Sequence, residues 1–510
     1  MQHRTPHPAP PHSLPELLES TSGAELKYEV PDLAITGITT HSQEVERGDL
    51  FVAIRGTRAD GHDFIADAVA RGAAAVVVER EPEPLPAVPV LRVERSRRLL
   101  AELSAAWFGH PARELPLVGI TGTMGKTSVL SFIETILGAA QMPVGSVGSL
   151  GVRCGGQPLE ETGHTLPGPL VLHRVLRELL GKGCRAALME ATTHALTQDR
   201  LRGVEYGLGV FTGLVPLEHM EYHDSFRSYV DAKLRYFDHL QPGSPLIYFS
   251  DDPALRSIVA EREVLPVPCG TGADAAVRVQ VEKIETAGTM LRLSAPGGVS
   301  RLDGTASEPF DLRLQLPLLG HSTATNATLA AAAAAALGAT PAAIEGGLTS
   351  LQPVRRRMQI VQREPFILLD DFGGHPNTVT AVFEVISALP WRRLHVVSGY
   401  RGTRGVPINR GMARALAIWA KRYRCESFFL TAAEDTSDER NWAQPEERSA
   451  FQEELRREGV SFVAEDRMDR AIQQAVERVG EGDLLLILGT QGMDGAAAAA
   501  QLYWAEAPSP

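Results

Sequence analysis

The stretch LPLVGITGTMGKTSVLSFIETIL, residues 115–137, decides the fold class of this chain. Its apolar start predicts a buried strand, its glycine-rich middle a tight turn, and its periodic end a helix. This order is typical of a phosphate-binding loop, in which backbone N–H groups at a helix N-terminus meet the phosphates of a nucleotide. Lys126 would offset the charge of those phosphates, and the Thr127 hydroxyl is placed for Mg²⁺.

One position of this loop departs from the usual pattern. Ile120 occupies the place where a glycine is expected, with Gly119 and Gly122 on either side. The alternative interpretation is an ordinary glycine turn that carries a surface lysine. Such a turn would rarely bring both a flanking strand and a flanking helix, so the segment predicts the binding of a nucleoside triphosphate.

Composition and charge narrow the class of protein. The chain has 510 residues, of which 44% are hydrophobic and 22% charged, which is typical of a soluble globular protein of about three domains. Its net charge of −12 argues against a surface that binds nucleic acid or anionic membranes. No stretch is long and apolar enough to span a membrane. We therefore expect a cytoplasmic protein that binds neither nucleic acid nor membranes, as a monomer or a weak oligomer.

The cysteines are scattered along the chain without the spacing of a metal or redox motif. They are Cys154, Cys184, Cys269 and Cys425. Reduced thiols are the expected state, in agreement with a cytoplasmic location.

The alternation of strands and helices predicts an α/β fold in three domains. We expect a flexible Pro- and His-rich tail over residues 1–24 and a small N-terminal domain over residues 25–108. A central domain built on the phosphate-binding loop would cover residues 109–350, and a Rossmann-like domain residues 351–510. Within the central domain, residues 326–338 (NATLAAAAAAALG) predict an alanine-rich helix that packs closely on a sheet.

The last third of the chain repeats strand and helix with unusual clarity. The predicted strands are FILLDDF, LHVVSGY, SFFLTAA and LLLILGT, with helical periodicity between them. Ligands of open α/β sheets bind beyond the carboxyl ends of the strands. The polar residues expected at that edge are Asp370, Asp371, His375, Arg401, Arg404, Thr431, Asp435 and Asp494. Two such sheets and a smaller N-terminal unit predict an enzyme that works in a cleft.

Glu190 and His194 lie at the end of another predicted buried strand, in the segment MEATTH. A carboxylate in that place is costly unless a cation accompanies it, and Mg²⁺ beside the phosphate-binding loop would supply one. The alternative interpretation is an acid at a strand end that is exposed to water.

Lys233 lies on the apolar stripe of a predicted amphipathic helix, residues 225–240 (SFRSYVDAKLRYFDHL). It follows Phe226 and Tyr229 at helical spacing, so it faces the same side as they do. A lysine whose charged end reaches water is one explanation. A functional role on that face is the other, and the spacing alone does not decide between them.

Two further segments cluster polar residues. EHMEYH (218–223) places two acids and two histidines after a strand, where either a metal site or a solvated loop would fit. VRRRMQ (354–359) joins the second and third domains with three consecutive arginines. Most basic runs are solvated, but one at a domain junction that faces a triphosphate is a candidate clamp.

Taken in order, these segments resemble the Mur ligase family of ATP-dependent amide ligases, which build the peptide stem of peptidoglycan. The resemblance covers most of the chain from residue 33 and is closest to the MurE branch, which adds the third amino acid to UDP-N-acetylmuramoyl-dipeptide. Residues 45–80 look like that branch's UDP-binding domain. TGTMGKT, HTLPGP (164–169), MEATTHAL, FTGL with EHMEYH, and SYVDAKLRYF then follow in the family's order.

The resemblance implies a role for each residue at a matching position. The family carbamylates the lysine at Lys233, which makes a carboxylate-like metal ligand. The implied catalytic residues are Lys126, Lys233, His219 and Glu190, and the implied metal ligands are Thr127, Glu190, Lys233 and His219. The implied ATP contacts are Gly122, Thr123, Gly125, Lys126, Thr127, Ser128, Asn326, Arg357 and Asp371. The implied substrate contacts are Ser42, His164, Thr165, Pro167, Thr193, Arg200, His375, Arg404, Asp435 and Arg440.

Several positions depart from the family's pattern. Met124 replaces an asparagine of the phosphate-binding loop, and Gly213 replaces the asparagine of the next motif. THSQ (40–43) keeps only Ser42 of the N-terminal Asp-Ser-Arg signature. The phosphate-binding residues are better preserved than the amino-acid site, whose departures lie in the C-terminal third.

The C-terminal third departs further. DDFGGHP (370–376) and the RRRMQ linker look more like the MurC branch, with Gly374 in place of one histidine. AAEDTSDER (432–440) occupies the region where members that use diaminopimelate carry Asp-Asn-Pro-Arg. The amino acid that is added does not follow from this segment.

The resemblance implies an ATP-dependent amide ligase that uses one or two Mg²⁺ ions and a carbamylated lysine. A substrate carboxylate would attack the γ-phosphate to give an acyl phosphate, and an incoming amine would then displace phosphate. The expected small-molecule acceptor is UDP-N-acetylmuramoyl-L-alanyl-D-glutamate. One alternative is the same chemistry on another carboxylate, such as a peptide, polyglutamate or specialised metabolite. The other is a degenerate scaffold that binds nucleotide without turnover.

Overall fold

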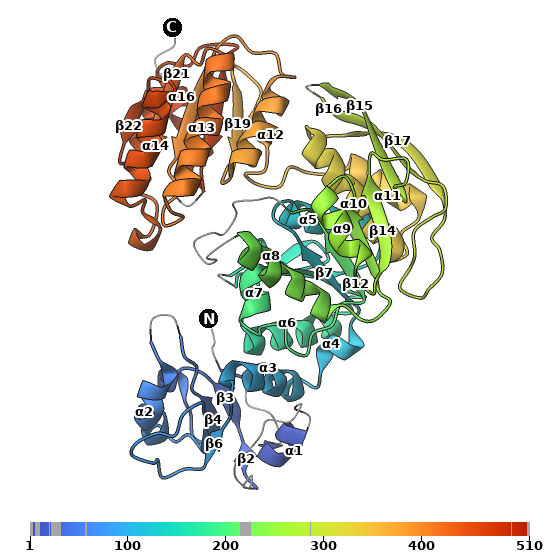
Figure 1. The fold of residues 1–510 in the computed structure, drawn as a ribbon, viewed down its shortest axis with the longest axis vertical. Coiled ribbons are helices and arrows are strands. Elements are labelled where there is room, and N and C mark those ends of the chain that lie inside the picture. Colours follow the sequence, from blue (N-terminus) through green and yellow to red (C-terminus); the bar gives the residue numbers. More distant parts are fainter. Residues whose placement is uncertain are drawn as a thin grey trace.

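The computed structural model describes residues 4–5, 11–19, 21, 32–56, 59–162, 164–214, 226–285, 287–490 and 492–506. It contains three α/β domains, each built on its own main sheet and placed one after another along the long axis (Figure 1). The predicted three-domain α/β class is therefore confirmed. The exact residues at which each domain begins and ends stay predictions.

The N-terminal domain is a four-stranded parallel sheet in the order β3-β4-β5-β6. Apolar side chains fill both faces of the inner strands, as expected of a parallel sheet covered on two sides. The elements are β3 (Gly37–Thr39), β4 (Asp49–Val52), α2 (Ile65–Ala70), β5 (Ala75–Val78), β6 (Val90–Arg92) and α3 (Ser96–Trp107).

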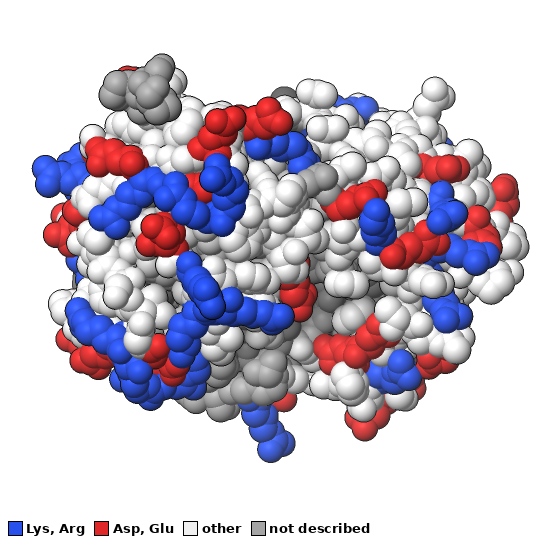
Figure 2. Space-filling model, turned by 90° about the horizontal axis from the view of Figure 1, so that it is seen from above, with Lys and Arg blue, Asp and Glu red and all other residues white. Residues whose placement is uncertain are grey.

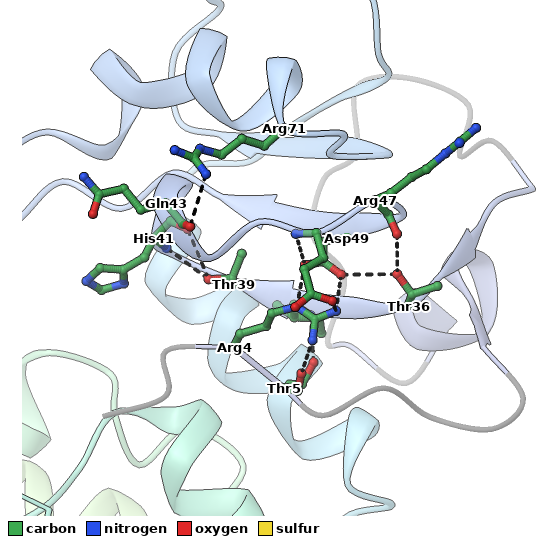
Figure 3. A network of polar contacts seen from close by, with 11 residues as sticks. Arg4, Thr5, Thr36, Thr39, His41, Gln43, Arg47, Asp49 and Arg71 are labelled. Atoms are coloured by element: carbon green, nitrogen blue, oxygen red, sulfur yellow. Dashed lines mark hydrogen bonds and ion pairs between the residues drawn. The ribbon is translucent and has the colours of Figure 1, made fainter.

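The segment predicted as a flexible tail is packed in its described part, so that prediction is wrong there. Arg4 donates from Nε and Nη2 to the two carboxylate oxygens of Asp49 at 2.6 and 2.8 Å (Figure 3). A short helix, α1 (Leu14–Glu19), buries its leucines against the N-terminal sheet. A Pro- and His-rich composition does not reveal these contacts, because they depend on residues far along the chain.

The central domain carries an eleven-stranded sheet with β7 (Leu117–Thr121) in its middle. β7 pairs in parallel with β11 (Ala187–Glu190) on one side and β12 (Leu208–Phe211) on the other. Register places Glu190 beside Ile120 and Phe211 beside Thr121, so the carboxyl ends of the three strands meet. The helix that follows β7 is α5 (Lys126–Ala139). The predicted strand, turn and helix of residues 115–137 are thus confirmed.

The alanine-rich helix packs closely, as predicted. α10 (His321–Ala336) buries the run from Ala330 to Ala336 almost completely. Small side chains let its backbone approach α5 and the strands beneath. Beyond them the sheet continues into an antiparallel extension that we did not predict, formed by β15 (Val277–Glu285), β16 (Gly288–Ala295) and β17 (Phe310–Leu316).

The C-terminal domain is a six-stranded sheet in the order β18-β19-β23-β20-β21-β22. Its edge strands are β18 (Gln359–Gln362) and β22 (Val463–Glu465). All four predicted strands are present, and they form the parallel centre of the sheet. They are β19 (Ile367–Asp371), β20 (Leu394–Gly399), β21 (Ser427–Thr431) and β23 (Leu484–Leu488). The helices around them are α12 (Pro376–Ile386), α13 (Val406–Arg422), α14 (Pro445–Arg457), α15 (Met468–Val476) and α16 (Ala496–Glu506).

Within the described residues, no helix combines the length and the apolar character needed to cross a bilayer. The face of the molecule seen in Figure 2 carries basic and acidic side chains intermingled rather than one continuous basic field.

His173, on α6 (Pro169–Gly181), makes the stability of the central domain depend on pH. Its ring is fully buried, and within the described part of the chain neither ring nitrogen has a hydrogen-bond partner. Burial, with a contribution from His110, lowers the pKa of His173 from 6.5 to about 4. Between these two values the unfolded chain binds a proton that the folded protein does not, so stability falls as the pH is lowered.

We expect His173→Leu to remove this part of the pH dependence. The wild type should lose about 1.4 kcal/mol of unfolding free energy per pH unit from this residue below pH 6.5. Urea unfolding at pH 7.5 and pH 5.0 would measure the difference between the two proteins. Replacing the exposed His321 with leucine is the control. An identical pH dependence in wild type and His173→Leu would contradict the expectation.

Candidate functional site

The turn between β7 and α5 requires glycine at two positions. Gly122 has a φ of +139°, and a Cβ there would lie 2.0 Å from Thr212 Oγ1. Gly125 has a φ of +86°, and a Cβ there would lie 2.5 Å from Asn326 Oδ1. The loop is therefore enclosed by the strand end after β12 on one side and by α10 on the other.

Two lysines converge on one carbonyl of this loop. Lys126 Nζ donates to the Gly122 and Thr123 carbonyl oxygens at 2.9 Å each. Lys233 Nζ, from α8 (Phe226–Leu234), donates to the same Gly122 oxygen at 2.9 Å. Two ammonium groups that share one oxygen repel each other, so the arrangement favours an anion at this place.

Lys233 does not extend its charged end to water, because only 2% of the residue is exposed. Its Nζ lies 5.1 Å from the centre of the Tyr229 ring, and the Tyr229 hydroxyl is 2.9 Å from Thr123 Oγ1. The helix thus places both side chains against the phosphate-binding loop. The explanation of Lys233 as a solvated surface lysine is wrong.

Glu190 ends β11 and is 1% exposed, so the interpretation as a water-exposed acid is also wrong. Its Oε1 accepts from the Ser149 backbone N–H at 2.8 Å, and its Oε2 from the Ser149 hydroxyl at 3.3 Å. The Ser149 hydroxyl also lies 3.2 Å from Thr165 Oγ1. No ion pair to Glu190 occurs within the described residues. A buried carboxylate without an ion pair fits a site for a cation.

The donors near the loop suit Mg²⁺, which prefers oxygen ligands. Thr127 and Ser128, both buried, follow Lys126 in the first turn of α5, and Glu190 supplies a carboxylate. Over the ranges that the structure covers, no three His, Cys, Asp or Glu side chains form a metal cluster. His219 and the EHMEYH segment lie outside the described residues.

Two arginines of the linker after α11 (Pro341–Thr349) make different main contacts. Arg356 is 3% exposed and binds within the C-terminal domain, donating to Asp494 Oδ1 at 2.7 Å and the Thr490 carbonyl at 3.0 Å. Arg357 lies closer to the Phe372 ring, at 4.5 Å from its centre against 5.6 Å for Arg356. Burial lowers the pKa of Arg357, and the charges of Asp371 and Glu190 oppose that effect. Arg357 therefore lies within electrostatic reach of Glu190, across the junction of two domains.

Asp371 ends β19 and holds the linker in place. Its two carboxylate oxygens accept from the backbone N–H groups of Met358 and Gly373 at 2.7 Å each. Burial raises the pKa of this carboxyl group. Both hydrogen bonds are local to the C-terminal domain and its linker, so any nucleotide contact of Asp371 is additional to a structural one.

Met124 joins the phosphate-binding loop to the C-terminal domain. The Thr378 hydroxyl, on α12, lies 3.2 Å from Met124 Sδ. The Met124 carbonyl also accepts a short hydrogen bond from the Thr212 hydroxyl. The residue that departs from the family's pattern in the sequence is therefore an interdomain contact in the structure.

A second group of predicted residues lies where the N-terminal and central domains meet. Arg200 donates to the Leu166 carbonyl at 2.7 Å, which ties it to the segment of His164, Thr165 and Pro167. Burial and the charge of Arg200 lower the pKa of His164. Arg97, from α3, reduces the pKa of Arg200 further, after the larger effect of burial.

The remaining predicted substrate residues are distributed differently. A side-chain hydrogen bond from Ser42 lowers the pKa of the Asp67 carboxyl group within the N-terminal domain. Thr193 is buried at the start of α7 (Thr193–Thr197). His375 precedes α12 and caps it, since its Nδ1 accepts from the Asn377 N–H at 3.1 Å.

Asp435 caps a helix, a role that we did not predict. Its carboxylate oxygens accept from the backbone N–H groups of Met468 and Asp469 at 2.7 and 3.2 Å, which caps α15. Arg404 lies in the loop before α13. Arg440 belongs to a short 3-10 turn, and its side chain lies outside the described part.

Sequence reasoning missed Ser149, Thr378 and Arg97. Ser149 follows a Gly-Ser pattern that is typical of ordinary turns, and Thr378 is an unremarkable helix residue. Their contacts join segments far apart in the chain, so no local signal could have found them. Arg97 is a basic residue at a domain junction, the same signal that drew attention to the 354–359 linker.

Comparisons with known proteins cover all three domains. Family models match the Mur ligase catalytic domain at residues 34–108, the Mur ligase middle domain at 120–334 and the glutamate ligase domain at 356–491. The UDP-N-acetylmuramoyl-L-alanyl-D-glutamate–2,6-diaminopimelate ligase of Halalkalibacterium halodurans is 31% identical over 93% of each chain. That of Chlorobaculum tepidum is 32% identical over 89% of this chain and 87% of the relative.

Solved structures show the same fold. The structure of MurF from Acinetobacter baumannii superposes with a TM-score of 0.67 and 21% identity, over 98% of this chain and 100% of the other. MurF ligase from Thermotoga maritima, solved in complex with ADP, gives a TM-score of 0.63 and 19% identity over 92% and 97%.

Proposed function

The chain belongs to the Mur ligase family, and from that premise we propose that it is an ATP-dependent peptide ligase of peptidoglycan biosynthesis. The observation that carries the proposal is the meeting of Lys126 and Lys233 at the Gly122 carbonyl, beside the buried Glu190. A turn with a surface lysine would need none of these neighbours. An ATP-cleaving ligase needs positive charge and oxygen ligands at that place.

The reaction divides into two steps. A carboxylate oxygen of the acceptor attacks the γ-phosphorus of ATP, the bond to the bridging oxygen breaks, and ADP leaves. The nitrogen of the incoming amine then attacks the carbonyl carbon of the acyl phosphate, and phosphate leaves as the amide forms. Lys126 and Arg357 would stabilise the negative charge that develops on the phosphoryl oxygens, and backbone N–H groups at the start of α5 would orient them.

Mg²⁺ and a modified Lys233 belong to the proposal. Thr127 and Glu190 would bind Mg²⁺, which supplies charge neutralisation to the phosphates when bound. Carbamylation of Lys233 would replace a buried ammonium with an anion, which removes its repulsion from Lys126 and adds oxygen ligands. His219 would be a further ligand from the segment beyond the described residues.

The acceptor proposed is UDP-N-acetylmuramoyl-L-alanyl-D-glutamate, the substrate in the names of the relatives. Arg200 and Arg97 support it, because two partly buried guanidinium groups at the junction of two domains suit a diphosphate. His164 and Thr165 would lie between that diphosphate and Glu190, since Thr165 contacts Ser149 and Ser149 contacts Glu190.

Phosphate release from ATP tests the function. The purified protein would be given the UDP-muramoyl dipeptide with a panel of amines, 2,6-diaminopimelate, lysine and ornithine among them. We expect phosphate release that requires both the acceptor and one amine. Release with only a peptide or polyglutamate acceptor would favour ligase chemistry on another carboxylate. No release with any acceptor would favour a nucleotide-binding scaffold.

The contact between Met124 and Thr378 predicts a mild effect on nucleotide use. Thr378→Val removes the hydroxyl near Met124 Sδ while it keeps the shape of the side chain. Because one weak hydrogen bond is lost, we expect the KM for ATP to rise by no more than about fivefold with kcat little changed. Steady-state kinetics would measure both values. A loss of kcat at unchanged KM would show that the contact acts in the chemical step instead.

A further inference from the structure

Two cysteines far apart in the sequence lie side by side in the central domain. Cys154 Sγ and Cys184 Sγ are 3.3 Å apart. Cys154 ends β9 (Gly151–Cys154), next to β8 (Gly145–Gly148), and Cys184 lies just before β11. Both sulfurs belong to free thiols in this structure.

Strand register and a backbone hydrogen bond fix the positions of the two cysteines. Register places Cys154 opposite Gly145, and Gly145 opposite Ala187 on the next strand. Cys184 is held by a backbone hydrogen bond to Leu179 at 3.1 Å. A disulfide has an S–S length of about 2.05 Å, so side-chain rotation over little more than 1 Å would bring the sulfurs together.

The two thiols differ in their exposure to solvent. Cys154 is half-buried, whereas Cys184 is 4% exposed. Burial and a hydrogen bond to Cys154 raise the pKa of Cys184 to about 12, so its sulfur keeps its proton at neutral pH. An oxidant from solution therefore meets Cys154 first. Cys184, whose sulfur lies 3.3 Å away, can resolve the product as its proton passes to the departing hydroxyl.

We propose that Cys154 and Cys184 are a redox modification site, which hydrogen peroxide converts into a reversible disulfide. The Cys154 sulfur attacks the peroxide, an S–O bond forms as the O–O bond breaks, and water leaves with a sulfenic acid behind. The Cys184 sulfur then attacks the Cys154 sulfur, the S–O bond breaks, and the Cys184 proton leaves with the hydroxyl as a second water. Two thiols lose two electrons in total, and one peroxide becomes two waters.

The disulfide closes the loop from residue 154 to residue 184. That loop contains β10 (Gln157–Glu160), the His164–Pro167 segment and α6. An ion pair of 2.5 Å between Glu160 and Arg174 already crosses it. Because the crosslink restricts the unfolded chain more than the folded one, it stabilises the central domain without a large change of its structure.

Treatment of the full-length protein with hydrogen peroxide tests the proposal. We expect titration of the denatured protein to find two fewer thiols, and the intact mass to fall by two hydrogen atoms. Peptide mapping without reductant should find Cys154 joined to Cys184. The thermal midpoint should rise by several °C and return to its original value with dithiothreitol.

Three variants make the result specific. Cys154→Ser and Cys184→Ser should each prevent the crosslink and the thermal shift, although both remain folded by circular dichroism. Cys425→Ser, which removes another half-buried cysteine far from the pair, should change neither. Oxygen added to Cys154 without a crosslink, a disulfide that uses Cys269 or Cys425, or unchanged thiols would each overturn the proposal.

Discussion

Lys126→Ala is expected to lower kcat for ATP-dependent ligation by about 100-fold to 1,000-fold, the range seen when one preorganised charge-stabilising group is lost. The lysine Nζ is held 2.9 Å from two loop carbonyls, so it is positioned before ATP arrives. Its charge is needed most when negative charge spreads over the transferring phosphoryl group. Phosphate release under saturating ATP and acceptor would measure the loss.

The control for this variant is Lys182→Ala. Lys182 is an exposed lysine at the end of α6, where a 3.7 Å ion pair to Glu178 contributes little. We expect it to keep full activity. Both variants should unfold at the wild-type temperature within a few °C, because the loop carbonyls that Lys126 contacts can also be satisfied by water. A Lys126→Ala protein with wild-type kcat would contradict the role assigned to this loop.

Lys233→Ala is expected to lower kcat by more than about 100-fold, since loss of a metal-supporting carboxylate exceeds the effect of an outer contact. The side chain is buried and directed at the Gly122 carbonyl, beside Lys126. If Lys233 acts as a carbamate, Lys233→Glu should retain more activity than Lys233→Ala, because it restores a carboxylate. Kinetics of the three proteins would establish this order.

Carbon dioxide provides an independent readout for Lys233. Wild-type activity should fall in carbonate-free buffer and recover when bicarbonate is added, whereas Lys126→Ala should show no such recovery. Lys283→Ala, an exposed lysine of the antiparallel extension, is the matched control and should respond as the wild type does. If Lys233→Ala is as active as the wild type, the carbamate proposal fails while the ATP site remains.

The central phosphate-binding loop could be predicted because its signal is local. Strand, glycines, lysine and helix are consecutive residues, so apolar periodicity and turn chemistry were sufficient to place them. The four strands of the C-terminal sheet were equally clear, since each is a short apolar run followed by polar residues. The packed N-terminal segment was missed because Arg4 depends on Asp49, a partner that no local pattern identifies.

The sequence by itself determined the α/β class, the phosphate-binding loop and the family's order of motifs, because these depend on residues close together in the chain. Only the tertiary structure decided which side chains meet. In the folded protein Lys233 donates to the Gly122 carbonyl, and Met124 contacts Thr378. Asp435 caps α15. Such pairings arise from packing between distant segments, where burial and hydrogen-bond geometry select among residues that composition leaves equivalent.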